Sequence, residues 1–316
     1  MNNTLYIVIP CYNEEAVLRE TCARMLDKLE RMIGERLCSG DSRVLFVDDG
    51  SKDATWALIE ELYTTQERVC GIKLSRNRGH QNALLAGLMA AREHADAVIS
   101  IDADLQDDVE VMSEMMQHFA DGCDVVYGVR KKRETDTWFK RATAQGFYKL
   151  MKGLGVDVVY NHADYRLMSR RALDGLAEYR EVNLFLRGIV PTIGYKSACV
   201  YYDRSERFAG ESKYPFKKML SFALDGITSF SVRPIKIISN LGIAISLLSV
   251  LGLLYALLSY VFGWALPGWT AIVASIWLLG GIQLLCIGII GGYIGKIYSE
   301  TKARPKYFIE TFLRRQ

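Results

Sequence analysis

Residues 97–106, AVISIDADLQ, decide the fold of this chain. Five small or apolar residues run directly into an acidic loop, which is the pattern of a strand buried on both faces with a polar site at its end. Asp102, Asp104 and the amide of Gln106 supply oxygen atoms of the kind that bind Mg²⁺ or Mn²⁺. The competing interpretation is that these side chains are solvated and that the acidic residues after them cap the next helix.

The same alternation of strand and helix extends to both sides of this stretch. Predicted strands cover residues 5–9, 44–47, 71–74, 97–101 and 124–128. Helical patterns cover residues 18–33, 53–64, 82–92 and 109–119. Continuous apolar strands separated by helices predict an α/β fold with a mainly parallel sheet that is covered on both faces.

Polar loops follow several of these strands and are expected to meet. In an open parallel sheet, ligands bind outside the carboxyl ends of the strands. The loops at Tyr12, Asp49, Arg76 and residues 102–104 all follow predicted strands. We therefore expect one active site at this edge.

The loop that begins at Asp48 is the second acidic loop at the predicted edge. A carboxylate held there can accept hydrogen bonds from a base N–H or from ribose hydroxyls. Alternatively, Ser51 or Asp53 caps the next helix and Gly50 supplies a positive φ. The two interpretations are compatible.

Residues 237–295 contain no Asp, Glu, Lys or Arg. A membrane-spanning helix needs about 20 apolar residues, so this run has room for two. We predict spans at residues 238–262 and 270–294, joined by a turn that contains Gly, Pro and Trp. Basic residues lie before and after the pair and none lies between the spans, which predicts that both termini are cytoplasmic.

Charge and composition exclude several other classes. The 316 residues carry a net charge of +3, but residues 296–316 alone contribute +4, with six Lys or Arg and two Glu. The rest of the chain is close to neutral, which argues against a nucleic-acid binder. The seven cysteines are scattered and predict reduced thiols without a zinc site. The four histidines are also spread out, and we interpret each as a core or surface residue.

Two further segments are predicted to be amphipathic helices. They cover residues 137–152 and 215–231, where aromatic and aliphatic residues alternate with basic ones at helical spacing. Such helices beside a membrane anchor can lie in the lipid interface. The alternative is that they only cover the sheet.

Six stretches together resemble a known family, the family 2 glycosyltransferases of the polyprenyl-phosphate type. The nearest relatives are the bactoprenol glucosyltransferases, with the dolichyl-phosphate mannose synthases as cousins. The matching stretches are Val8–Glu15, Val47–Thr55, Leu74–His80, Asp102–Asp107, Ala163–Arg170 and Glu206–Tyr214. Residues 291–298 and 304–307 match the C-terminal part of the family, so the resemblance covers nearly the whole chain.

The resemblance implies a role for each matching residue. It implies a Rossmann-like GT-A catalytic domain in which Asp164 is the catalytic carboxylate. Donor-binding residues would be Pro10, Tyr12, Glu14, Asp48, Asp49 and Arg76. The metal, Mg²⁺ or Mn²⁺, would be held by Asp102, Asp104 and Gln106. The acceptor phosphate would be surrounded by Arg130, Arg141, Arg207, Ser212 and Lys213.

The resemblance also implies an activity and a location. We expect transfer of a hexose from a UDP-sugar, with UDP-glucose first, to undecaprenyl (polyprenyl) phosphate with inversion at the anomeric carbon. The site would lie at the cytoplasmic face of the bacterial inner membrane, in a homo-oligomer. The implied order is a GT-A domain over residues 1–214, an interfacial helix over 215–236, two spans within 237–295 and a basic tail over 296–316.

Two alternatives stay open at this stage: the donor is a UDP-N-acetylhexosamine, or the protein is a membrane-tethered sensor that binds nucleotide sugar without turnover. A third class, the processive polysaccharide synthases, is disfavoured. The last class carries a Q-x-x-R-W motif and more spans, and neither is found in this sequence.

Overall fold

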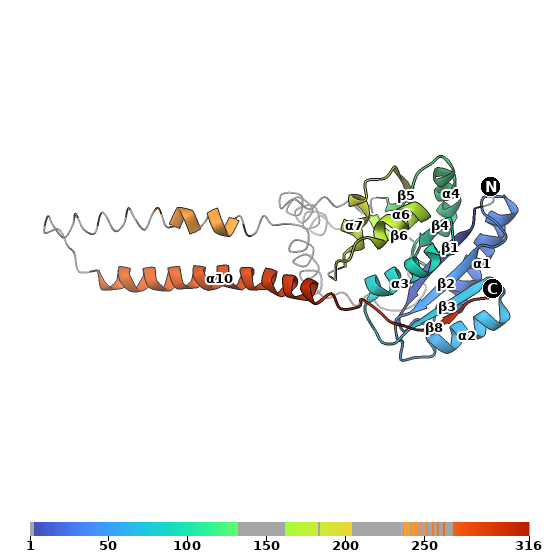
Figure 1. The fold of residues 1–316 in the computed structure, drawn as a ribbon, viewed down its shortest axis with the longest axis horizontal. Helices are drawn as coiled ribbons and strands as arrows, with labels where there is room; N and C mark the ends of the chain where they lie inside the picture. The colour runs from blue at the N-terminus through green and yellow to red at the C-terminus, as the bar shows by residue number, and fades with distance from the viewer. Residues whose placement is uncertain are drawn as a thin grey trace. The chain divides into compact units, whose positions relative to one another are not determined.

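The computed structural model describes residues 3–131, 162–182, 184–203 and 268–315, together with residues 235, 237–240, 242–245, 247, 251, 255, 258 and 262. The chain falls into two compact units, coloured by residue number in Figure 1. Both predicted amphipathic helices, at 137–152 and 215–231, lie outside the described residues.

The larger unit contains both ends of the chain. It comprises residues 1–148, 158–214 and 303–316, and the smaller unit comprises residues 149–157 and 215–302. Residues 303–316, which the sequence analysis treated as part of a basic tail, therefore belong to the same unit as the predicted site.

An eight-stranded sheet forms the centre of the larger unit, with the order β7-β5-β6-β4-β1-β2-β3-β8. The strands are β1 (Leu5–Cys11), β2 (Arg43–Asp48), β3 (Val69–Leu74), β4 (Ala97–Ser100), β5 (Val125–Arg130), β6 (His162–Ser169), β7 (Ser197–Tyr202) and β8 (Ile309–Leu313). β4, β1, β2 and β3 are parallel, and so are β5 and β7. β6 and β8 run antiparallel to their neighbours. The predicted α/β class with a mainly parallel sheet is confirmed.

The helices of the larger unit alternate with these strands. They are α1 (Leu18–Gly34), α2 (Thr55–Thr65), α3 (His80–Arg92), the 3₁₀ turn η1 (Val109–Val111), α4 (Met112–Ala120), α6 (Arg170–Ala177) and α7 (Leu186–Thr192). The strands and helices predicted between residues 5 and 128 are each present, with bounds shifted by a few residues. Every residue of β1 is buried, as expected for a strand covered on both faces.

Helix α3 lies unusually close to the sheet because residue 87 is a glycine. A Cβ atom at Gly87 would lie 2.4 Å from a methyl carbon of Val8 and 2.7 Å from one of Val47. Any larger residue would push the helix away from β1 and β2. This close packing fixes the first residue of α3, His80, at the carboxyl edge of the parallel strands.

Strand β6 was expected only as a family motif. It pairs with β4 so that Ser100 lies opposite Arg166 and Ala97 lies opposite Ser169. If the same register is continued past the end of β4, Asp164 falls opposite Asp102. Two residues that are 62 positions apart in sequence are thereby brought to the same edge.

Strand β8 comes from the C-terminal end of the chain. It pairs antiparallel with β3, with Phe312 opposite Ile72 and Thr311 opposite Lys73. The backbone N–H of Ser75 also donates to the carbonyl of Phe308 at 3.0 Å. The segment covers what would otherwise be an open sheet edge at β3.

The smaller unit contains the long helix α10 (Trp269–Lys302). Within the described residues, the segment Leu279–Lys302 is long and apolar enough to cross a membrane. This helix overlaps the second predicted span at 270–294. The first predicted span, 238–262, is described only in part, with residues 238–240 and 242–245 helical, so the two-helix hairpin stays a prediction.

Candidate active site

The four central parallel strands end at one edge, and each is followed by a loop with predicted site residues. Two non-glycine residues in these loops have positive φ, Asn13 at 54° and Leu105 at 56°. Backbone strain of this kind concentrates at functional sites. The side chain of Leu105 is buried, which anchors the acidic loop while Asp104 and Gln106 lie on either side of it.

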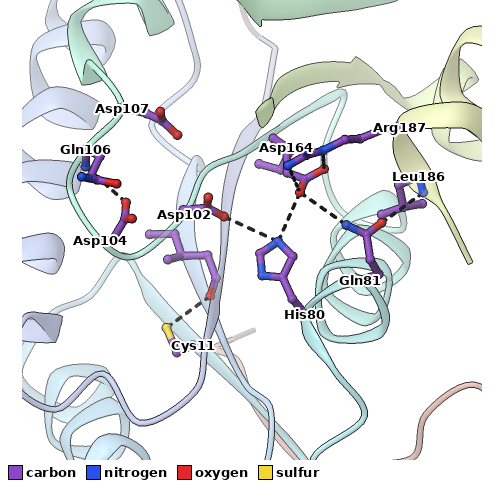
Figure 2. A network of polar contacts seen from close by, with 12 residues as sticks. Cys11, His80, Gln81, Asp102, Asp104, Gln106, Asp107, Asp164, Leu186 and Arg187 are labelled. Atoms are coloured by element: carbon purple, nitrogen blue, oxygen red, sulfur yellow. Dashed lines mark hydrogen bonds and ion pairs between the residues drawn. The ribbon is translucent and has the colours of Figure 1, made fainter. Parts of the chain in front are cut away.

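Asp102 and Asp164 meet at His80, as Figure 2 shows. The Nε2 atom of His80 lies 3.5 Å from Oδ1 of Asp102 and 3.5 Å from Oδ2 of Asp164. Burial lowers the pKa of His80, but the two carboxylates outweigh burial and raise it above its ordinary value. The predicted metal ligand and the predicted catalytic carboxylate are thus neighbours of one imidazole.

Asp164 is the centre of a buried ionic network. Nη2 of Arg166 donates to its Oδ1 at 2.7 Å, while Arg187 donates from Nε to Oδ1 at 3.2 Å and from Nη2 to Oδ2 at 3.0 Å. The Gln81 amide donates to Oδ2 at 3.3 Å. Burial alone would raise the pKa of Asp164, but His80, Arg187 and Arg166 hold it well below its usual range. The group is therefore a carboxylate at neutral pH and a weak proton acceptor.

Asp102 has the properties of a cation ligand. Its Oδ1 atom is buried and accepts no hydrogen bond from the described residues. Burial raises the pKa of Asp102 to about 6, with His80 lowering it and Asp164 among the groups that raise it further. A divalent cation would bind this oxygen, whose 3.5 Å contact with His80 does not count as a hydrogen bond, and would stabilise its charge. The residues present therefore fit a metal ion.

One hydrogen bond joins two of the predicted metal ligands within the acidic loop. Oδ1 of Asp104 accepts from the backbone N–H of Gln106 at 3.2 Å. Among the described residues, no group of three His, Cys, Asp or Glu side chains is arranged to hold a metal ion. The predicted ligand set of Asp102, Asp104 and Gln106 stays a prediction.

Arg130, predicted near the acceptor phosphate, lies beside this loop. Its Nη2 donates to Oδ1 of Asp107 at 3.0 Å, and the Tyr202 hydroxyl donates to the same oxygen at 2.6 Å. Arg130 is half-buried at the end of β5. The contact joins the acidic loop to β5 and β7, and it places a fixed positive charge near the predicted metal site.

Asp49 has a structural task in addition to the predicted donor contact. Its two oxygens accept from the backbone N–H groups of Arg78 at 2.6 Å and Gly79 at 2.8 Å. Asp48 accepts from the N–H of Ser51 at 3.2 Å. Asp49 thereby ties the loop that carries Arg76 to the end of β2.

The other predicted donor residues line the same edge. Pro10 is buried in β1, opposite Val47. Tyr12 and Arg76 are exposed, and the backbone N–H of Glu14 donates to the Thr55 hydroxyl at 2.9 Å. The remaining predicted acceptor residues lie outside the described residues: Arg141, Arg207, Ser212 and Lys213.

Sequence reasoning missed four residues that contact Asp164: His80, Gln81, Arg166 and Arg187. His80 and Gln81 follow the loop after the third predicted strand, so their position at the strand-end edge was a usable signal. Arg166 is two residues after Asp164 in a strand, which puts both on one face. Arg187 lies on the seven-residue helix α7, which has no periodic signal in the sequence.

Comparison with known proteins identifies relatives along the whole chain. Residues 6–176 match the family model described as Glycosyl transferase family 2. An uncharacterized glycosyltransferase of Bacillus subtilis, YkoT, is 56% identical over 97% of this chain and 91% of its own length. The bactoprenol glucosyl transferase of Shigella phage SfX is 38% identical over 96% of this chain and 98% of its own length.

Solved structures share the fold at low sequence identity. The mannosyltransferase PcManGT from Pyrobaculum calidifontis, solved with GDP-Man and Mn²⁺, aligns with a TM-score of 0.50 and 16% identity over 93% of this chain and 88% of that one. The likeness supports the GT-A form of the α/β fold.

Proposed function

The chain belongs to glycosyl transferase family 2, and from that premise we propose that it transfers glucose from UDP-glucose to undecaprenyl phosphate, with a divalent metal ion and inversion at the anomeric carbon. Two phage relatives that match over nearly their whole length are named bactoprenol glucosyl transferase, which supports the choice of sugar and acceptor. The reaction takes place at the cytoplasmic face of the membrane.

One geometric observation carries the proposal. Asp102, whose buried Oδ1 accepts no hydrogen bond from the described residues, and Asp164, which is charged at neutral pH, both lie 3.5 Å from His80 at the carboxyl edge of the sheet. A cation site next to a fixed negative charge matches the two charges that develop when a sugar is transferred from a nucleoside diphosphate. The leaving diphosphate needs positive charge, and the sugar carbon that it leaves needs negative charge.

The metal would be held by Asp102 and Asp104, with Gln106 in reach of the same loop. When bound, the ion neutralises charge that develops on the leaving diphosphate. The chain's own contribution is to fix these oxygens: Leu105 anchors the loop, and Asp107 attaches it to Arg130 and Tyr202.

Asp164 acts by charge and position rather than by removing a proton. The attacking phosphomonoester has a second pKa near 6, so it is largely ionised at neutral pH and needs no strong base. Asp164 is a weak base because His80, Arg187 and Arg166 lower its pKa. Its carboxylate stabilises positive charge on the sugar and orients the sugar for an in-line attack.

Two arguments support anchoring in the membrane: the lipid nature of the proposed acceptor, and the pairing of the C-terminal strand β8 with β3. A polyprenyl chain stays in the bilayer, so an enzyme held at the surface shares one layer with its substrate. Because β8 follows α10 and pairs with β3, a chain that crosses the membrane within 279–302 must also cross it once earlier. We assign that crossing to the uncharged residues 238–262, and the flanking basic residues put the sheet in the cytoplasm.

The test is transfer by the full chain in lipid nanodiscs with undecaprenyl phosphate. UDP-glucose and UDP-N-acetylglucosamine are compared with Mg²⁺, Mn²⁺ or EDTA, and UDP release and glycolipid formation are measured together. We expect glucosyl lipid of inverted configuration, which EDTA abolishes and metal restores.

Other outcomes would overturn this assignment. UDP release without glycolipid would reject the acceptor, and preference for UDP-N-acetylglucosamine would reject the sugar. Binding of UDP-glucose without any turnover would favour a sensor. Asp102→Asn should raise the half-saturating metal concentration by about 100-fold or more. Mutation of residues that only support a metal ligand by hydrogen bonds already lowers metal affinity by about 10–100-fold.

A further inference from the structure

Asp164 is paired with two arginines that differ sharply in their surroundings. The side chain of Arg166 is 1% exposed, and that of Arg187 is 41% exposed. Arg166 also donates from Nη1 to the carbonyl of Leu186 at 3.3 Å, so it is locked between β6 and α7. Arg187 contacts the same carboxylate but keeps much of its own side chain exposed to solvent.

One buried carboxylate needs one buried cation, and Arg166 meets that need. Asp164 already contacts Arg166, the imidazole of His80 and the amide of Gln81. Arg187 brings a second arginine charge to this carboxylate. Its fork of N–H groups, which now fits Asp164 through two hydrogen bonds, has the geometry that fits a phosphate equally well.

Arg187 also interacts electrostatically with residues of both predicted phosphate sites. Burial lowers its pKa, but Asp164 and then Asp102 raise it above the ordinary value, while Arg130 opposes them. The guanidinium therefore senses both Asp102, the predicted metal ligand, and Arg130, the predicted acceptor arginine. In Figure 2 it lies on the side of Asp164 away from the acidic loop.

We propose that Arg187 is a phosphate-binding residue that exchanges at least one of its hydrogen bonds to Asp164 for a phosphate oxygen of a bound substrate. The phosphate belongs to the donor diphosphate or to the acceptor phosphomonoester. The exchange leaves Arg166 as the buried partner of Asp164 and removes one positively charged donor from the carboxylate, so that more of its negative charge acts on the sugar. Substrate binding and the charge that acts on the sugar would thus be coupled. This inference rests on the proposed function.

The test compares Arg187→Gln with the wild type in the full chain in nanodiscs. Titration calorimetry with UDP and Mn²⁺ gives the donor-side Kd, and initial rates give the KM for undecaprenyl phosphate. Loss of a charged hydrogen bond predicts that one of these constants rises about 10- to 100-fold. A rise in the Kd for UDP identifies the diphosphate, and a rise in the KM alone identifies the acceptor phosphate.

Two variants keep the result interpretable. Arg187→Lys keeps the charge but loses the fork, so the same constant should rise by a smaller factor, and this variant carries the test if Arg187→Gln fails to fold. Arg19→Gln is the matched control, because Arg19 also makes two hydrogen bonds to one carboxylate, that of Glu61, on exposed helix surfaces. It should change neither constant.

An unchanged Kd and KM in a folded variant, with only kcat reduced, would overturn the inference and make Arg187 a positioning residue for Asp164. Failure of the wild type to make glycolipid would instead reject the proposed function. The two failures are therefore separate: one is read from the wild type alone, the other from the comparison of wild type with variant.

Discussion

The ring of Phe308 lies 5.8 Å from the guanidinium carbon of Arg78, although 230 residues separate them. Arg78 is in the loop whose backbone N–H groups bind Asp49, and Phe308 immediately precedes β8. The C-terminal segment that follows the apolar helix α10 therefore contacts the predicted donor loop directly.

Phe308→Ala should weaken donor binding and leave acceptor binding unchanged. An exposed cation–π contact contributes about 0.5–1 kcal/mol. Its loss predicts a KM for UDP-glucose that is about two- to fivefold higher, measured from initial rates. Phe312→Ala in β8, the strand that follows Phe308, is the control. An equal change in the KM for both substrates would show that Phe308 affects only the general stability of the unit.

Gly50→Ala should destabilise the unit and displace the donor loop. Gly50 has φ +65°, and a Cβ there would lie 2.7 Å from backbone atoms of Arg76 and Asn77. The left-handed conformation costs an L-residue about 1–2 kcal/mol, which lowers the unfolding midpoint by about 2–8 °C.

The clash at residue 50 should also raise the KM for the donor, because it displaces the backbone of Arg76 and Asn77 in the predicted donor loop. Gly40→Ala is the matched control, because Gly40 has no atom within 4 Å of such a Cβ and φ is not positive. Differential scanning fluorimetry and donor kinetics check both effects. Equal midpoints for the two variants would contradict the structural role of Gly50.

Asp164→Asn should reduce turnover far more than donor binding. The amide keeps the shape and some hydrogen bonds but loses the charge, and loss of one preorganised electrostatic group costs about 10²–10³ in kcat. The Kd for UDP should change little. Asp174→Asn, which breaks the exposed pair with Arg92, is the control. Normal turnover of Asp164→Asn would exclude a catalytic role.

Glu110 should make the unit sensitive to acid. Hydrogen bonds from Arg31 and Lys28 lower its pKa from 4.5 to about 2, so the folded state holds the proton less tightly than the unfolded state. The stabilisation is complete above about pH 4.5 and is lost as the pH falls toward 2. Because the Glu110 side chain is 54% exposed, we expect no more than about 1 kcal/mol.

Glu110→Gln should lower the unfolding midpoint at pH 7 and flatten its dependence on pH between 4.5 and 2. Lys28 contributes to this loss, since its side chain is buried and its Nζ lies 2.9 Å from Glu110. Glu114→Gln, the control, should behave like the wild type. A parallel pH dependence for Glu110→Gln and wild type would contradict the predicted contribution.

Much of the site could be predicted from strand ends. Asp48 and Asp102 each follow a continuous apolar run, and parallel strands that end at one edge bring such residues together. The sequence interpretation of the histidines misses His80. Its place after a strand-end loop was a usable signal for the edge, but no local pattern shows that α3 begins beside the acidic loop. That position depends on Gly87 and on the close contact it allows with Val8 and Val47.

By itself, the sequence determined which segments are buried strands, which strands are followed by carboxylates and which uncharged segment can enter a membrane. These features follow from local periodicity and hydropathy. Tertiary structure alone decided that Asp164 faces Asp102, that Arg187 shares it with Arg166, and that the C-terminal strand completes the sheet. These contacts depend on strand register and on which edges pair, and residues far apart in the chain leave no local pattern that encodes either.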